Sequence, residues 1–297
     1  MKQNSTPAID FLLLAAVWGS SFLFMRMGAL EFGAWSTAGL RVGIAAIALL
    51  PLLLMRCDLR QVRQRAGALL LVGLLNAGIP FALYSYALQH IGTGLTAILN
   101  ASSPLFGALV AWLWLRERPG RWRLLGLAMG FLGIVLLSWH KVSLGGGQTG
   151  WAVLACLGAT LCYGIAASCT RRFLSDVPPL SITAASLIGA TLFLAPAMVW
   201  HWPSLTPGLT AWGALLALGL LCTSWAYVLY YRLIATAGPA KALTVTFMVP
   251  LFALLYAALL LGETVTPAMA IYGLVILFGV ALSTEFIQPQ RWLVRRA

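Results

Sequence analysis

Ten apolar stretches, separated by short polar or turn-forming segments, constrain the fold of this chain more than any other feature of its sequence. An α-helix rises about 1.5 Å per residue, so about 20 apolar residues cross the hydrocarbon core of a bilayer. No connecting segment is long enough to form a separate catalytic domain. The sequence therefore predicts an all-α membrane protein with ten transmembrane helices, at Ile9–Gly28, Ala34–Met55, Ala66–Leu88, Thr93–Leu115, Arg123–Trp139, Gly150–Thr170, Leu180–Trp200, Leu209–Tyr231, Ala240–Leu261 and Pro267–Phe286.

The charged residues are few and unevenly placed. Only 9% of the 297 residues are charged, whereas soluble domains carry about a quarter. The net charge of +12 does not indicate a nucleic-acid-binding protein, because the basic residues form short clusters between apolar stretches. Sixteen lysines and arginines lie in alternate loops and at the chain ends, against Lys141 alone in the intervening loops. Because cytoplasmic loops are enriched in these residues, both termini are predicted to be cytoplasmic.

The two halves of the chain resemble each other. A shift of 146 residues aligns Phe81–Leu136 with Tyr227–Leu282 without a gap, and a shift of 145 aligns the helices that open each half. The matched pairs include Pro104 and Pro250, Glu117 and Glu263, Trp18 and Tyr163, Gly19 and Gly164, and Arg26 and Arg171. The sequence thus predicts two five-helix repeats at 1–141 and 150–286, followed by a basic cytoplasmic tail at 287–297.

An odd number of helices in the repeat forces its second copy to enter the membrane with the opposite orientation. Inverted repeats of this kind are typical of transporters, in which the solute site lies between the repeats near the bilayer midplane.

Motifs within each half carry a family resemblance. The first half contains Trp18-Gly19-Ser20-Ser21-Phe22, Pro104-Leu105-Phe106 and Leu115-Arg116-Glu117-Arg118, and the second contains Pro250-Leu251-Phe252 and Leu261-Gly262-Glu263. With the five-plus-five repeat, these motifs resemble the drug/metabolite transporter superfamily, specifically its EamA-like branch. The resemblance implies a bacterial inner-membrane exporter or importer of small metabolites, with amino acids prominent among the cargoes.

A solute pathway is expected to be lined by polar and aromatic side chains near the middle of the spans. The candidate substrate-binding residues at this depth are Trp18, Asn76, Asn100, Tyr163, Trp225, Tyr227, Thr244 and Thr246. Each of them also has a structural interpretation. Amides and hydroxyls join helices to one another, threonine bonds its own helix backbone, and aromatic rings pack between helices.

Arg41 and Tyr84 complete the candidate set. Arg41 lies about 10 Å into the second span, where an unpaired guanidinium costs at least a few kcal/mol. It either receives a substrate carboxylate, pairs with helix carbonyls or extends to the interface. Tyr84 and Tyr230 lie near opposite faces of the bilayer, as gate residues or as interfacial anchors. Pro104 and Pro250 are candidate hinges, because each removes a backbone hydrogen bond at a matching position.

The titratable residues indicate neither catalysis nor ion coupling. All seven carboxylates lie at helix ends or in loops, which argues against a buried proton-carrying glutamate and favours facilitated diffusion or exchange. Glu117 and Glu263 are interpreted as caps of the helices that follow them, and Arg26 as an interfacial residue. The five cysteines lack metal-ligand spacing, so no metal, cofactor or disulfide is expected.

The sequence therefore favours a secondary transporter that moves small metabolites, such as amino acids or their derivatives, across the inner membrane by alternating access. Its partners are the solute and the lipid bilayer, and it is expected to be a monomer or a weak homodimer. A transporter of nucleotide sugars or drug-like solutes is the first alternative. A membrane-embedded lipid enzyme is the second, although the scattered histidines and carboxylates offer no catalytic cluster.

Overall fold

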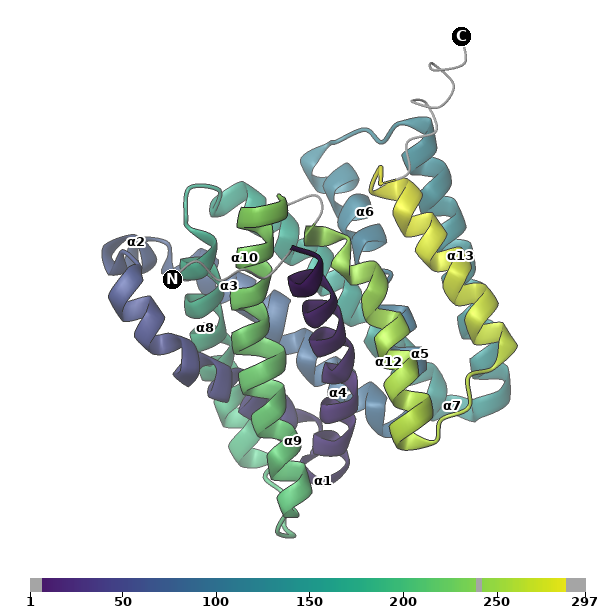
Figure 1. Cartoon of the computed structure of the whole chain (residues 1–297), viewed down its shortest axis with the longest axis horizontal. Helices are drawn as coiled ribbons and strands as arrows, with labels where there is room; N and C mark the ends of the chain where they lie inside the picture. Colours follow the sequence, from purple (N-terminus) through teal and green to yellow (C-terminus); the bar gives the residue numbers. More distant parts are fainter. Residues whose placement is uncertain (1–6, 239–241, 287–297) are drawn as a thin grey trace.

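The described part of the chain is helical, with helices joined by short connections (Figure 1). The computed structural model describes residues 7–238 and 242–286, without the side chains of residues 140–146. The start of the ninth expected span at Ala240 and the basic tail at 287–297 lie outside this description. The elements are α1 Pro7–Arg56, α2 Leu59–Gln64, α3 Ala66–Gly73, the π-helix η1 Leu74–Gly78, α4 Ile79–His90, α5 Thr93–Asn100, α6 Ser103–Leu115, α7 Arg121–Phe173, α8 Pro179–Trp200, α9 Leu209–Gly219, the π-helix η2 Leu220–Trp225, α10 Ala226–Ala237, α12 Val245–Leu261 and α13 Pro267–Ser283.

Seven helical segments within the described residues are long and apolar enough to cross a membrane. Two shorter apolar helices, α12 and α13, have 17 residues each. Helix α1 covers the first two expected spans and bends between them at Gly33, whose φ of 76° and ψ of 174° suit glycine alone. Helix α7 covers the fifth and sixth expected spans in two apolar segments, Arg121–Trp139 and Gly147–Phe173.

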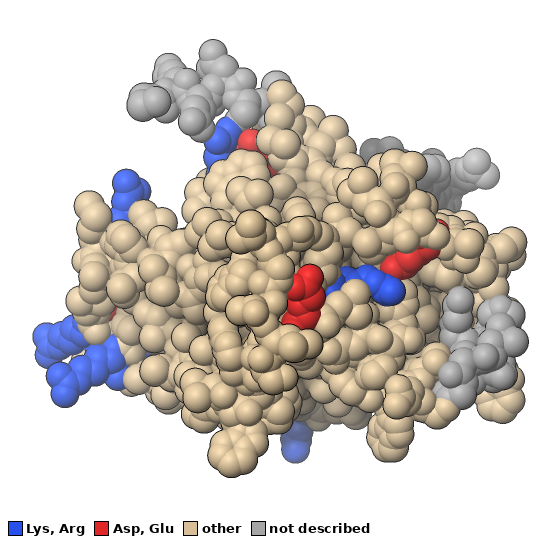
Figure 2. Space-filling model, turned by 90° about the horizontal axis from the view of Figure 1, so that it is seen from below, with Lys and Arg blue, Asp and Glu red and all other residues tan. Residues whose placement is uncertain are grey.

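Large apolar side chains cover the outside of these helices. Ile47, Leu113 and Leu209 are 73%, 71% and 90% exposed. Seen from below, the molecule presents a face on which only a few acidic and basic side chains interrupt neutral ones (Figure 2). An apolar surface of this extent is stable in lipid rather than in water. Together with the apolar segments, it is the surface of a multi-pass membrane protein.

Glycines allow several helices to approach closely. A Cβ atom on Gly279 of α13 would lie 2.5 Å from the backbone nitrogen of Gly130 in α7, and one on Gly73 of α3 would lie 2.1 Å from the carbonyl oxygen of Ser186 in α8. Small residues are favoured at such helix interfaces in membranes because they permit backbone contact. Helix α1 begins and α13 ends at the same end of the bundle, at the top of Figure 1.

Candidate functional site

A cavity of about 440 Å³ lies in the middle of the bundle, and its walls come from both halves of the chain. Eight of the ten residues that the sequence singled out for substrate binding line it: Trp18, Arg41, Asn76, Tyr84, Asn100, Tyr163, Tyr227 and Thr246. The candidate hinge Pro104 lines it as well. No aspartate or glutamate is among the described residues that form the wall, so the cavity combines aromatic rings, amides and hydroxyls with a single cation.

Two π-helices shape this cavity. Asn76 lies in η1, and Cys222 and Thr223 lie in η2, and all three residues line the wall. The two π-helices occupy matching positions, because Leu74 and Leu220 are 146 residues apart. A π-helical turn inserts an extra residue, which shifts side chains around the helix axis, and such turns are frequent at functional sites. Neither π-helix was expected from the sequence.

Arg41 is held in place by two neighbours from different helices. Its Nε donates a 3.1 Å hydrogen bond to the Thr223 hydroxyl oxygen, and that hydroxyl donates in turn to the Leu218 carbonyl. The guanidinium carbon lies 3.6 Å from the centroid of the Phe81 ring, a cation–π contact. Arg41 is 6% exposed, and its charge faces the cavity rather than the lipid.

Aromatic rings line much of the cavity wall. The Tyr84 hydroxyl donates a 2.9 Å hydrogen bond to Oδ1 of Asn100, and Tyr84 is 1% exposed. The ring of Tyr84 also lies 6.1 Å from that of Tyr163. Trp18 packs against Tyr230 with ring centroids 5.4 Å apart. These rings give the cavity large apolar faces with hydroxyl groups at their edges.

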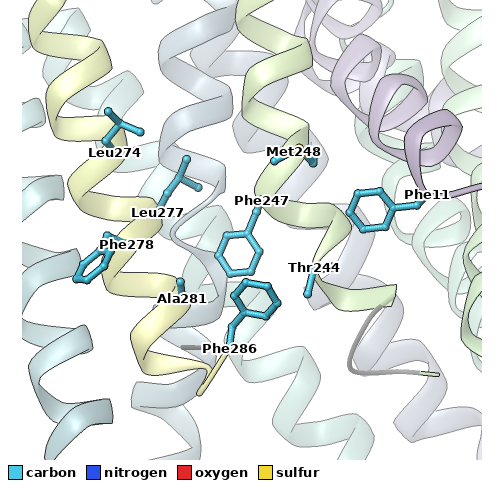
Figure 3. Close-up of a pocket in the computed structure, with 9 residues that line it drawn as sticks. All are labelled: Phe11, Thr244, Phe247, Met248, Leu274, Leu277, Phe278, Ala281 and Phe286. Carbon is cyan, nitrogen blue, oxygen red and sulfur yellow. The ribbon is translucent and has the colours of Figure 1, made fainter. Parts of the chain in front are cut away.

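Trp225 and Thr244 are not brought to this cavity. Trp225 is 40% exposed on the outside of η2. Thr244 lines a separate apolar groove of about 520 Å³ beside the rings of Phe247 and Phe286 (Figure 3). The second candidate hinge, Pro250, is buried inside a continuous α12, whereas Pro104 follows a break between α5 and α6.

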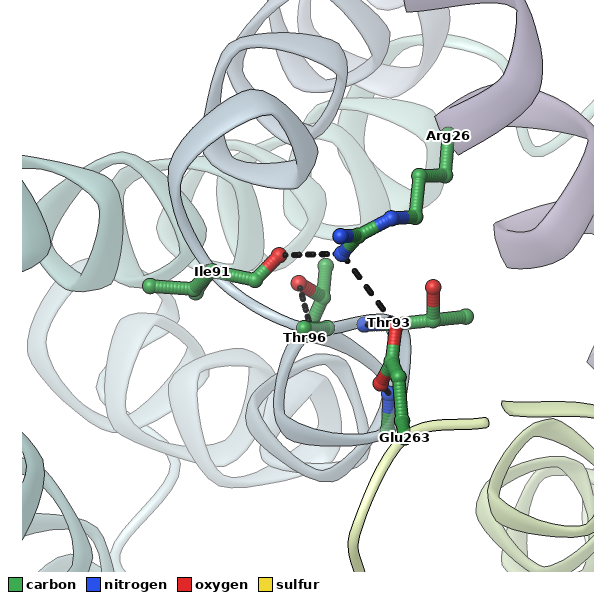
Figure 4. Close-up of polar contacts among 7 residues, drawn as sticks. Arg26, Ile91, Thr93, Thr96 and Glu263 are labelled. Atoms are coloured by element: carbon green, nitrogen blue, oxygen red, sulfur yellow. Dashed lines mark hydrogen bonds and ion pairs between the residues drawn. The ribbon is translucent and has the colours of Figure 1, made fainter. Parts of the chain in front are cut away.

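An ion pair at the edge of the bundle was not anticipated from the sequence. Glu263 accepts hydrogen bonds from the backbone nitrogens of Thr93, at 2.8 Å, and Gly94, at 3.2 Å, at the start of α5. Arg26 lies 3.2 Å from the same carboxylate and also donates to the carbonyl of Ile91 (Figure 4). The interpretation of Glu263 as a cap of the following helix is wrong, because it caps α5, and the Thr266 hydroxyl caps α13.

A second ion pair joins the matching residues, Arg171 and Glu117. Because Arg171 matches Arg26 and Glu117 matches Glu263, each pair joins one half of the chain to the other. The signal in the sequence was the repetition of both residues, but only the fold shows that each arginine meets the glutamate of the opposite half.

The comparisons with known proteins agree with this architecture. A model of the EamA-like transporter family matches residues 6–139 and 150–284. The "Probable terminal-alkyne amino-acid exporter" of Streptantibioticus cattleyicolor is 27% identical, over 93% of this chain and 93% of the exporter. The "Uncharacterized inner membrane transporter YedA" of Escherichia coli strain K12 is also 27% identical, over 95% of this chain and 92% of its own length.

A more distant relative and a solved structure extend the same pattern. The "Uncharacterized transporter YvbV" of Bacillus subtilis strain 168 is 22% identical over 98% of this chain and 96% of its own. One crystal structure, 18% identical in sequence, shares the fold with a TM-score of 0.63, over 96% of this chain and 98% of that one. Since the family match covers nearly all of both halves, the chain belongs to the EamA-like transporter family.

Proposed function

We propose that the chain is a secondary transporter with ten membrane spans that moves amino acids or their derivatives, or small metabolites like them, by alternating access. The central cavity carries the proposal, because it lies between two halves of the chain and offers amides, hydroxyls, aromatic rings and one guanidinium. The eight cavity residues from the sequence analysis are the proposed solute-binding residues. The name of the 27%-identical exporter supports an amino-acid-like cargo.

Matching contacts between the halves support an inverted repeat. Gly19 of α1 lies against Phe252 and Ala253 of α12, and its counterpart Gly164 lies against Phe106 and Gly107 of α6. Phe252 and Ala253 are the residues that a shift of 146 matches to Phe106 and Gly107. The two cross-half ion pairs follow the same rule. Contacts that exchange the halves in this way are expected from a pseudo-two-fold axis between two repeats.

The two ends of the cavity differ, as alternating access requires. In the first half, the Tyr84 hydroxyl of α4 donates to Asn100 of the next helix, α5. At the matching positions of the other half, Thr246 instead donates to the Leu243 carbonyl near the start of its own helix, and Tyr230 packs on Trp18. We infer that the Tyr84 end is closed in this conformation and that a transport cycle would exchange the two arrangements, with Pro104 and Pro250 as hinges.

The basic residues support an orientation of the chain in the membrane, and the bacterial relatives support its location. We infer a bacterial inner membrane with both termini in the cytoplasm, because the arginine-rich loops and the ends of the chain fall on one side of the predicted spans. The common end at which α1 begins and α13 ends supports this topology (Figure 1).

The cavity composition disfavours the alternative cargoes. A drug-like cation would need a carboxylate, and none lies among the described lining residues. A nucleotide sugar carries several phosphate charges, which would need more cations than Arg41. Among the described lining residues, no nucleophile is paired with a base, as a lipid enzyme would need.

Counterflow in liposomes tests the proposal. Purified protein would be reconstituted with an internal panel of unlabelled amino acids, N-acylated amino acids and small metabolites, and uptake of the labelled solutes would be measured. We expect exchange of at least one class, and its loss in Trp18→Ala and Asn100→Ala. Trp225→Ala is the matched control, because it removes the same ring from outside the cavity. No exchange by the wild type, or equal exchange by all variants, would contradict the proposal.

A further inference from the structure

Among the residues that the structure describes, no carboxylate balances the charge of Arg41. The described residues include all seven acidic side chains of the chain, and each has a partner elsewhere. Five of them form ion pairs with other arginines, Glu31 accepts from the backbone nitrogen of Gly208, and Asp58 caps α2. An uncompensated cation at this depth is unfavourable, since lipid and protein solvate it poorly. The counter-ion of Arg41 is therefore expected to be an anion that does not belong to this chain.

Packing does not explain the arginine. At a shift of 145, Arg41 matches Ser186 of α8. The two positions also have related surroundings: Gly73 lies against the backbone of Ser186, and its counterpart Gly219 lies against the Ile44 side chain and the carbonyl of Arg41. At the matching helix contact, the second half of the chain has Ser186 in place of an arginine. The Ser186 hydroxyl donates a hydrogen bond to the Leu69 carbonyl. The helix interface needs a close backbone approach there, and it does not need a guanidinium.

The remaining donors of Arg41 are free to bind. Its Nε is used by Thr223, and the face of the guanidinium is covered by Phe81. Among the described residues, the Thr223 contact is its one hydrogen bond, so the two terminal nitrogens remain available on the side of the cavity. Two parallel N–H donors match the two oxygens of a carboxylate. The fixed Nε and the ring hold this fork in one orientation.

We infer that the solute taken at this site is a monoanionic carboxylate with an apolar or aromatic body, in preference to a free zwitterionic amino acid. The inference rests on the proposed transport function and names its substrate class. The carboxylate would pair with Arg41, and the body would lie on the Trp18, Tyr163 and Tyr230 rings. An α-ammonium group would place a second cation within a few bond lengths of that carboxylate, and no described acidic residue lines the cavity to balance it. An amino acid whose nitrogen is acylated avoids this cost.

Three probes that share one skeleton test the charge preference. At about pH 6, N-acetyl-L-phenylalanine is a monoanion, L-phenylalanine is a zwitterion and L-phenylalaninamide is a cation. Their apparent Kd values would be measured from the ligand-dependent rise in melting temperature of the full chain in mild detergent. We expect the monoanion to bind about ten-fold or more tightly than the zwitterion, and the cation to bind least.

Variants at the same position connect this preference to the guanidinium. Arg41→Gln is expected to weaken the monoanion by about ten-fold or more and to change the zwitterion little, and Arg41→Lys to retain part of the affinity. Arg63→Gln removes an exposed charge outside the cavity and is expected to change none of the values. The melting temperatures of the empty variants check that each is folded.

Two outcomes would overturn the inference while leaving the proposed function intact. One is a wild type that binds phenylalanine as tightly as its N-acetyl derivative. The other is an Arg41→Gln variant that loses affinity for all three probes alike. Failure of the wild type to bind any probe would also overturn the inference, and the counterflow panel judges the proposed function separately.

Discussion

The ion pair between Arg26 and Glu263 offers a quantitative test of how the two halves are held together. The Glu263 carboxylate accepts from two backbone nitrogens at the start of α5 and pairs with Arg26, and the two side chains are 18% and 28% exposed. Glu263→Gln keeps the shape of the side chain and removes its charge. The amide has a single oxygen, so one of the two backbone donors of Thr93 and Gly94 would face an NH₂ group.

The magnitude follows from these contacts. A hydrogen bond to a charged group contributes about 1.5–3 kcal/mol, and a carboxylate at a helix N-terminus adds about 0.3–1 kcal/mol. Partial exposure holds the ion pair itself to less than about 1 kcal/mol. Because the glutamine retains one weaker hydrogen bond, we expect Glu263→Gln to lower the free energy of unfolding by about 2–3 kcal/mol.

The repeat supplies its own control, Glu117→Gln. Glu117 pairs with Arg171, whose side chain is 65% exposed, and the surface location limits that pair to less than about 1 kcal/mol. Unfolding by sodium dodecyl sulfate in mild detergent, followed by circular dichroism, would compare the two variants, and Arg26→Gln would complete a double-mutant cycle with Glu263→Gln. Equal losses for the two glutamate variants, or a larger loss for Glu117→Gln, would refute this reasoning.

Three further outcomes are expected. Gly279→Val should lower the free energy of unfolding by about 1–3 kcal/mol, since its Cβ would lie 2.5 Å from a backbone nitrogen of α7, whereas Gly213→Val has open space and should change it little; unfolding by sodium dodecyl sulfate measures both. Tyr84→Phe should fold normally and slow solute exchange by about three- to ten-fold, because it loses the hydrogen bond to Asn100 in the cavity wall, and an unchanged rate would contradict this. Arg65 donates to the Asp176 carboxylate and holds the pKa of that carboxylate below its ordinary value. The ionised carboxylate therefore stabilises the folded chain fully above about pH 4, and this stabilisation is lost as the pH falls further. Below about pH 4, the melting temperature of the wild type should fall more steeply than that of Asp176→Asn.

The membrane architecture could be predicted because it depends on local sequence. The apolar stretches had to be helical in lipid, since no water is present there to bond the backbone. Gly33 falls between the first two expected spans, and the chain bends there. The precise path was less predictable: the fifth and sixth expected spans both fall within α7, as the apolar segments Arg121–Trp139 and Gly147–Phe173.

The sequence indicates how deep in the membrane each candidate site residue lies, but not which side of its helix the residue faces. Thr223 and Tyr227 line the cavity, whereas Trp225, at nearly the same depth, does not. Successive helical residues are about 100° apart, so residues two positions apart point to nearly opposite sides. Thr244 and Thr246 differ in the same way. Choosing one face required the packing of the other helices, and two of the helices change phase at π-helical turns that local sequence does not reveal.

The repeat separates the residues that build the fold from those that distinguish its two sides. Glycines at close helix contacts and the arginine–glutamate pairs occur in both halves, so they serve an architecture that both halves share. The polar residues of the cavity are not repeated in both halves, because Asn76 is matched by Cys222, and Asn100 by Thr246. Since these amides and Arg41 all belong to the first half, the solute site that we propose draws its amides and its cation from that half, and the second half contributes mainly rings and hydroxyls. The double variant Asn100→Thr with Thr246→Asn should therefore fold normally but transport solute more slowly. Full transport activity of that variant would show that solute binding does not depend on which half of the chain carries the amide.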